Sequence, residues 1–204
     1  MNLLTFLLAA SYKKIHLTGL FFLIIFPLIS CVADVGAHEP NKNSVVVNPT
    51  VEALFTPGDK IARRIVDLID DAKHDIKIQA YGFTNTAITN ALVAAKRRGV
   101  DVQIIEDDGE YLNINNFSKT KLDSLKATGA KIYLDSEHAI AHNKIILIDA
   151  STPQHALITG SYNFTQAAEK NNAENVLLIR ANADIIAAYL ANWKKHVAHS
   201  TPLP

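Results

Sequence analysis

The chemically informative part of the sequence begins at His142 and Lys144, which stand two positions apart. The residues around them predict a strand over positions 143–148, and side chains at i and i+2 of a strand point to one face. Such a pair suits a protein core poorly, because lysine is almost never buried without a partner. It suits an anion well, since the ammonium attracts the anion and the imidazole can act as a nucleophile or as an acid and base.

Two polar segments follow this pair along the chain. Ser161 and Asn163 lie between a predicted strand and a predicted helix, where their side chains and the N–H groups of the helix start can hold anionic oxygens. Glu174 and Asn175 begin the next predicted strand. A carboxylate at position 174 could accept a hydrogen bond from the imidazole of His142 and so fix its tautomer.

Taken in order, these segments resemble the signature of the phospholipase D superfamily. Its pattern is His-x-Lys-x-x-x-x-Asp, represented here by His142, Lys144 and Asp149. The later Gly-Ser-x-Asn and Glu-Asn segments match the superfamily's small bacterial nucleases. The three-residue pattern alone is weak, whereas the ordered combination is specific.

The resemblance covers about residues 51–196. Upstream of the signature, the segments Tyr81-Gly82-Phe83-Thr84 and 98–102 look like the family's first half. Ala150 replaces the family's usual glycine, and the connection over residues 150–156 is somewhat longer than usual. Both departures fall in a turn away from the expected phosphate site, so they put little of the resemblance in doubt.

The resemblance implies a phosphodiesterase that uses neither a metal nor another cofactor. His142 would attack phosphorus and form a phosphohistidine intermediate. Lys144 and Asn163, aided by Ser161, would hold the non-bridging oxygens as charge develops. A second histidine would protonate the leaving oxygen and then activate water.

Three other residues of the resemblance have different expected roles. Glu174 belongs to the catalytic set, and Asn175 to the substrate-binding set. Asp149 is counted as catalytic because it is part of the signature. Its place at the far end of the strand predicts that it braces neighbouring backbone or a side chain instead of contacting phosphate.

The mechanism needs two His-Lys pairs, one on each side of the phosphorus, and the chain has one pair and no internal repeat. A twofold-symmetric homodimer that completes the active site is therefore expected.

Three functions fit these residues. The first is a non-specific endonuclease for DNA, with RNA left open; little sequence preference is expected because the site grips phosphate and not base edges. The second is a lipid phosphodiesterase that cleaves phospholipid head groups or cardiolipin. The third is a binding protein without activity, which the intact set of polar residues disfavours.

The elements that must position these residues alternate between strand-like and helix-like periodicity. This alternation predicts an α/β fold with a mixed, largely parallel sheet flanked by helices on both faces. The two strands next to Asp149 are expected to add antiparallel pairing. The expected strands cover residues 51–55, 75–80, 100–106, 131–134, 143–148, 156–159 and 175–180, and the expected helices cover residues 59–72, 85–98, 118–128, 166–171 and 182–196.

The remaining titratable residues are expected to be unremarkable. The segment Glu106-Asp107-Asp108 follows a strand and is expected to be a solvated acidic loop more often than a divalent cation site. Four other histidines lack partners in the sequence and are expected at the surface; they are His74, His155, His196 and His199. His138 is a loop candidate for substrate contact, but a solvated surface position is favoured.

Composition is that of a globular protein, with 49% apolar and 20% charged residues. Lysine and arginine equal aspartate and glutamate at 20 each, which disfavours a strongly basic protein that coats nucleic acid. A local basic groove remains compatible with this balance, because net charge does not report distribution.

The N-terminus resembles a targeting segment. An apolar run over residues 17–29 follows Lys13 and Lys14, and small residues follow it. This order predicts a secretory signal over residues 1–37, with export to the periplasm or the medium. A lipoprotein box ending at Cys31, which would carry a lipid anchor, and a retained membrane anchor are the alternatives. Residues 38–50 are expected to form a linker, and residues 197–204 a tail.

Overall fold

The computed structural model describes residues 48–113 and 117–203. The predicted export signal, the lipidation site at Cys31 and most of the predicted linker lie outside the described residues, so they stay predictions. Among the described residues, no helix combines the length and the apolar character needed to cross a membrane.

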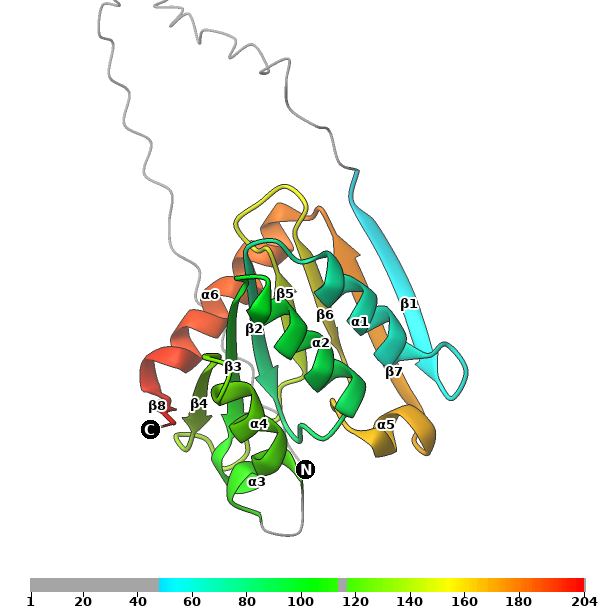
Figure 1. The fold of residues 1–204 in the computed structure, drawn as a ribbon. Helices are drawn as coiled ribbons and strands as arrows, with labels where there is room; N and C mark the ends of the chain where they lie inside the picture. The colour runs from blue at the N-terminus through cyan, green and yellow to red at the C-terminus, as the bar shows by residue number, and fades with distance from the viewer. Residues whose placement is uncertain (1–47, 114–116, 204) are drawn as a thin grey trace, which may run out of the picture. The chain divides into compact units, whose positions relative to one another are not determined.

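Within the described residues, eight strands form one sheet in the order β1-β7-β6-β5-β2-β3-β4-β8 (Figure 1). Their bounds are β1 Thr50–Thr56, β2 Asp75–Ala80, β3 Asp101–Asp107, β4 Lys131–Asp135, β5 Ile145–Ile148, β6 Ala156–Gly160, β7 Glu174–Arg180 and β8 Thr201–Pro202.

The predicted mixed sheet is confirmed, but the expectation that it is largely parallel is wrong. Only the pairs β2–β3 and β3–β4 are parallel, and the five other adjacent pairs are antiparallel. A parallel pair needs a crossover of a dozen or more residues, usually through a helix. The connection between β5 and β6 is a short turn over residues 149–155, so these two strands pair antiparallel, as expected for the strands next to Asp149.

Six helices are described. Their bounds are α1 Ile61–Asp71, α2 Thr86–Arg97, α3 Asp108–Leu112, α4 Ser118–Lys126, α5 Gln166–Lys170 and α6 Ala183–His199. Helices α1, α2 and α4 pack on one face of the sheet, and α6 covers the other (Figure 1). The predicted coverage of both faces is therefore confirmed.

Alternation along the strands supplies both cores. In β5, Ile146 and Ile148 belong to the cluster under α1 and α2, whereas Ile145 and Leu147 belong to the cluster under α6. Trp193 of α6 is buried in the second cluster, and its indole N–H donates to a backbone carbonyl of β2 at 3.4 Å. Each fully buried large apolar side chain contributes about 1.5–3 kcal/mol, so α6 is fixed to its face of the sheet.

The C-terminal residues are part of the fold, which corrects the predicted tail. Helix α6 continues to His199, and β8 then pairs with β4. Ser200 donates its hydroxyl to the His196 carbonyl at 2.8 Å, and Leu203 N–H donates to the Ile132 carbonyl at 2.9 Å. These bonds satisfy backbone groups that a solvated tail would leave to water.

Candidate active site

Strand pairing brings the predicted site segments to one edge of the sheet. β5 begins at Ile145, whose partners are Gln79 near the end of β2 and Thr159 near the end of β6. β6 in turn ends against the start of β7. Because β5 and β7 run opposite to β2 and β6, the residues just before β5 and β7 meet the residues just after β2 and β6.

His142 and Lys144 form the centre of this edge together with Tyr81. The His142 side chain is exposed, whereas Lys144 is buried and its Nζ donates to the His142 carbonyl at 2.9 Å. The ring of Tyr81 contacts the imidazole edge to face, with centroids 4.5 Å apart. The same ring lies 5.2 Å from Nζ of Lys144. Tyr81 therefore holds the imidazole of His142 by ring packing and stabilises the ammonium of Lys144 through a cation–π contact.

Burial gives Lys144 an unusual protonation equilibrium. Loss of water around the ammonium lowers the pKa of Lys144 to about 8, although the negative charge of Glu174 opposes this shift. An anion placed next to the ammonium would favour its charged form. A buried lysine with a perturbed pKa beside an exposed imidazole marks a functional site better than either residue alone.

Ser161, Glu174 and Asn175 form a second polar group at this edge. The hydroxyl of Ser161 donates to Glu174 Oε2 at 2.6 Å, and Asn172 Nδ2 donates to Oε1 at 2.9 Å. Ser161 also accepts from the N–H of Asn175 at 3.1 Å. The predicted hydrogen bond between Glu174 and His142 is not formed, since Ser161 and Asn172 engage the carboxylate and Tyr81 packs on the imidazole.

Gly160 allows the two strands that carry this group to approach each other. A Cβ atom at position 160 would lie 2.2 Å from the carbonyl oxygen of Asn175 and 2.9 Å from the Cα of Val176. Only glycine fits at such a distance, so the Gly-Ser sequence places Ser161 directly against the start of β7.

Asn163 is flanked in the sequence by Tyr162 and Phe164, whose rings are buried. Its Oδ1 atom is buried and has no hydrogen-bond partner. A buried amide oxygen without a partner is uncommon and calls for a ligand, a partner chain or a water. Asn163 makes no hydrogen bond to His142 or Lys144, so the structure leaves its predicted contact with phosphate as a prediction.

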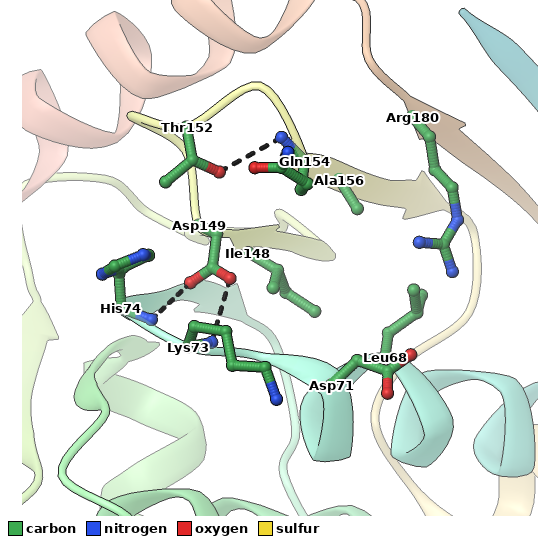
Figure 2. A pocket seen from close by; sticks show the side chains of 10 residues that line it. All are labelled: Leu68, Asp71, Lys73, His74, Ile148, Asp149, Thr152, Gln154, Ala156 and Arg180. Carbon is green, nitrogen blue, oxygen red and sulfur yellow. Dashed lines mark hydrogen bonds between the residues drawn. The ribbon is translucent and has the colours of Figure 1, made fainter. Parts of the chain in front are cut away.

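Asp149 lies at the opposite end of β5, which corrects its place in the catalytic set. Its carboxylate accepts three backbone N–H groups, from Lys73 at 2.9 Å, His74 at 2.7 Å and Asp75 at 3.0 Å. Figure 2 shows the carboxylate turned toward Lys73 and His74 in a pocket of about 370 Å³ that Arg180 also lines. The expectation that Asp149 braces backbone is confirmed.

The segment Glu106-Asp107 is buried, so the expected solvated acidic loop is wrong for these two residues. Asp107 Oδ2 accepts the N–H of Ala141 at 2.8 Å and thereby holds the residue next to His142. Glu106 Oε1 accepts the N–H of Gly82 at 3.0 Å, next to Tyr81. Burial raises the pKa of Glu106 to about 8. Both carboxylates hold the backbone next to His142 and Tyr81 by hydrogen bonds, a role that sequence spacing alone does not reveal.

Of the other histidines, His138 and His199 are exposed as the sequence predicts, whereas His155 is buried and His196 is partly buried. His155 is buried, and its Nδ1 lies 2.6 Å from the carbonyl of Thr152. His138, His196 and His199 gather around the buried carboxylate of Asp135. His74 is exposed, as expected.

Beside the His142 imidazole the surface is hollowed. An open pocket of about 340 Å³ is lined by residues from the start of β5, the end of β6 and one side of α6; they include His142, Lys144, Thr159, Tyr189 and Asn192. Its lining combines polar and apolar surface and supplies an exposed imidazole, a cation and amide groups. This set can bind and attack a phosphate ester.

The chain is similar to known proteins of one family. Residues 65–197 match the family described as cardiolipin synthase, PLD-like domain. A protein named phospholipase D from Rickettsia bellii is 40% identical over 150 residues, which are 74% of this chain and 70% of that protein. A mitochondrial cardiolipin hydrolase from Canis lupus familiaris is 27% identical over 138 residues, 68% of this chain and 51% of that protein.

Solved structures show the same fold. The phospholipase D family member Nuc from Salmonella typhimurium superimposes with a TM-score of 0.70 and 32% identity, over 76% of this chain and 99% of that one. NucT from Helicobacter pylori superimposes with a TM-score of 0.65 over 76% of this chain and 100% of that one. At 22% identity, the second likeness concerns the fold alone.

Proposed function

The chain belongs to the phospholipase D superfamily of phosphodiesterases, and on that premise we propose that it is an endonuclease that hydrolyses DNA without a metal, with RNA as a further candidate substrate. The observation that carries this proposal is the exposed imidazole of His142 next to the buried ammonium of Lys144. One supplies the nucleophile and the other the positive charge, so the site itself contains what a divalent cation would otherwise provide.

The proposed reaction has two displacements at phosphorus. In the first, a nitrogen of His142 bonds to phosphorus while the bond to the leaving oxygen breaks, and a second imidazole gives its proton to that oxygen. In the second, the same imidazole takes a proton from water, whose oxygen bonds to phosphorus as the phosphorus–nitrogen bond breaks. Lys144 and Ser161 hold the non-bridging oxygens throughout, with Asn163 in the same role once substrate is bound.

The second imidazole must come from another molecule. No hydrogen bond or ring contact joins His142 to another histidine anywhere in the described chain. We therefore propose a homodimer in which His142 of the partner subunit faces this one across a twofold axis. The exposed apolar side chains of Phe55 and Leu177, on the strands next to the site, fit such an interface.

A lipid phosphodiesterase is the second candidate, because relatives of this chain carry the names phospholipase D and cardiolipin hydrolase. The nuclease is preferred on the character of the site. The pocket beside His142 is open, and His142, Ser161 and Asn175 are all exposed along one edge. A polymer can lie along such an edge, while the reaction requires a grip on phosphate alone.

The direct test offers supercoiled DNA, RNA, phosphatidylcholine vesicles and cardiolipin vesicles to the full chain in excess EDTA. The proposal expects nicking of DNA by the wild-type chain and by His74→Ala, an exposed histidine outside the site, and none by His142→Ala. Cleavage of lipid in place of nucleic acid would establish the second candidate. Loss of all activity in EDTA, by a chain that circular dichroism shows to remain folded, would rule out the metal-independent reaction.

Subunit mixing tests the dimer separately. Wild-type and His142→Ala chains are unfolded together, refolded at several ratios and assayed. If each site requires an imidazole from both subunits, activity falls with the square of the wild-type fraction. A linear fall, or a fully active monomer by light scattering, would contradict the shared site.

A further inference from the structure

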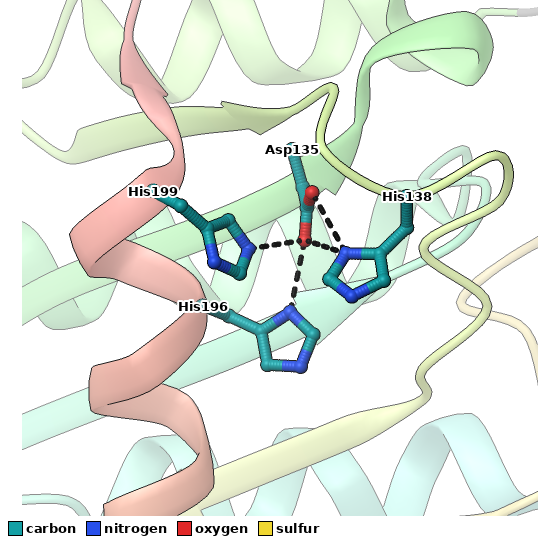
Figure 3. Close-up of side chains that lie close together, drawn as sticks. All are labelled: Asp135, His138, His196 and His199. Atoms are coloured by element: carbon teal, nitrogen blue, oxygen red, sulfur yellow. Dashed lines mark hydrogen bonds and ion pairs between the residues drawn. The ribbon is translucent and has the colours of Figure 1, made fainter.

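Three histidines converge on one carboxylate at a place the phosphodiesterase reaction does not use. Oδ2 of Asp135 lies 2.9 Å from Nδ1 of His196, 3.2 Å from Nε2 of His199 and 3.2 Å from Nδ1 of His138. The four candidate ligand atoms lie within 4.8 Å of one another. Figure 3 shows the three rings turned toward the carboxylate from three sides.

The four residues come from three separate segments. Asp135 ends β4, His138 lies in the connection from β4 to β5, and His196 and His199 share one face of the last turns of α6. Spacing of i and i+3 on a helix places two side chains side by side. Chance gathering of three imidazoles from two segments around one buried carboxylate is therefore a weak explanation.

Exposure across the cluster falls in steps toward the carboxylate. The side chain of His138 is 46% exposed, that of His199 29%, that of His196 13% and that of Asp135 0%. The carboxylate is thus fixed at the bottom, and the rings that must move to admit an ion are the ones nearest to water. Burial by itself raises the pKa of Asp135, but hydrogen bonds from the three imidazoles outweigh it and leave the pKa below its usual value.

We propose that Asp135, His138, His196 and His199 bind one divalent transition-metal ion, with zinc as the ion whose geometry fits best. Four-coordinate zinc takes imidazole nitrogen and carboxylate oxygen at about 2.0–2.1 Å, so the edges of its tetrahedron measure about 3.3 Å. The three oxygen-to-nitrogen distances already approach that value. The ring nitrogens complete the tetrahedron by drawing together through rotation of His138 and His199, the most exposed members.

The ligand set also selects against other ions. Calcium and magnesium prefer oxygen ligands, and three of the four ligands are nitrogens. Copper(II) and nickel(II) prefer tetragonal geometry, whereas the three rings surround the carboxylate from three sides. Neutral imidazole coordinates through the nitrogen that carries no proton, so ion binding moves each ring's proton from the nitrogen facing Asp135 to the opposite nitrogen.

Four protein ligands leave no open position for substrate, which is the arrangement of a structural zinc site. The ion would tie the end of α6 and the strand β4 to the connection that continues from His138 to His142. The ion is therefore expected to stabilise the fold and to keep that connection in place, without taking part in the displacement at phosphorus.

The experiment uses the full chain produced without a histidine tag. After removal of metals with a chelator and dialysis, zinc is added and the bound metal is counted by mass spectrometry. We expect one zinc per chain and a rise in Tm on zinc addition. We also expect cobalt(II) to give the intense visible absorption of a tetrahedral site, which zinc then removes.

Variants separate a metal site from a hydrogen-bonded cluster. His196→Ala combined with His199→Ala is expected to weaken zinc binding at least about 100-fold and to abolish the cobalt spectrum. If the double variant does not fold, the single variant His199→Ala, which alters a partly exposed side chain, is used in its place and is also expected to weaken zinc binding. His74→Ala is the matched control and binds as the wild type does.

Two results would overturn the proposal. One is a wild-type chain that binds far less than one zinc ion per chain and shows no tetrahedral cobalt spectrum. This result can be interpreted without any variant. The other is equal zinc affinity in the wild type and in His199→Ala. Either would leave the three imidazoles as hydrogen-bond donors to Asp135 alone.

Discussion

Two clusters that contain histidine, one around His142 and one around Asp135, differ in the charge that lies next to the imidazole. His142 stands exposed over the ammonium of Lys144, with an aromatic ring at its side and no carboxylate bonded to it. His196 points at the fully buried carboxylate of Asp135, as two other imidazoles do. A cation beside an imidazole favours binding of an anion, whereas a carboxylate among imidazoles favours binding of a cation.

The difference shows that histidine does not define a site by itself. In the first cluster the His142 ring lines an open pocket, so a ligand can reach it. In the second the ring nitrogens face inward, toward the protein's own carboxylate. The first arrangement supports turnover and the second supports retention of an ion.

The largest expected effect is that variants in the two clusters lose different properties, turnover in one and zinc binding in the other. His142→Ala should lower phosphodiesterase turnover at least about 10⁴-fold, the scale seen when a nucleophile is removed, and should leave zinc binding intact. His196→Ala should weaken zinc binding and lower Tm, with turnover at low temperature within about an order of magnitude of wild type. Equal loss of turnover in both variants, with Tm unchanged, would make the two clusters one active site.

The next effect concerns the cation of the first cluster. Lys144→Ala should lower kcat about 10²–10³-fold, because an oxyanion-stabilising charge is lost. In the wild type, kcat/KM should fall as pH rises through about 8, where the buried ammonium loses its proton. Lys144→Arg keeps the charge and should remove this alkaline fall. An alkaline fall that persists in Lys144→Arg would assign it to another group.

A smaller effect is expected at Asp149, the signature residue that lies away from both clusters. Asp149→Ala leaves three backbone N–H groups without their acceptor and should lower the free energy of unfolding by about 2–4 kcal/mol. Asp149→Asn keeps one acceptor oxygen and should lose less. Urea unfolding measures both, and turnover per folded molecule should change little. Loss of turnover without loss of stability would return Asp149 to the catalytic set.

The smallest effect is at Glu106, below Tyr81. Burial raises its folded pKa to about 8 from an ordinary 4.5, so its contribution to stability is full below about pH 4.5 and is lost as pH rises to about 8. Glu106→Gln has no such dependence. Its Tm should therefore gain a few degrees on the wild type between about pH 5 and about pH 8. An equal gain in Asp71→Asn, an exposed carboxylate, would point to net charge instead.

The sequence by itself determined the alternating elements and indicated the residues of the proposed phosphate site. Periodicity is local, so the positions of most strands and helices could be predicted, and the ordered motif from His142 to Asn175 indicated the chemistry. It also indicated that a single motif is too few for the proposed reaction. These properties depend on residue types and on spacing along the chain.

Tertiary structure alone decided the pairing of strands and the partners of distant side chains. The antiparallel pairs of β5, β6 and β7 follow from short connections, whose direction residue periodicity does not encode. Asp135 and His196 are 61 positions apart, and only the packing of α6 against the sheet brings them together. Burial likewise turned Glu106 from an expected surface acid into a support for the site, because desolvation depends on neighbours that the sequence separates.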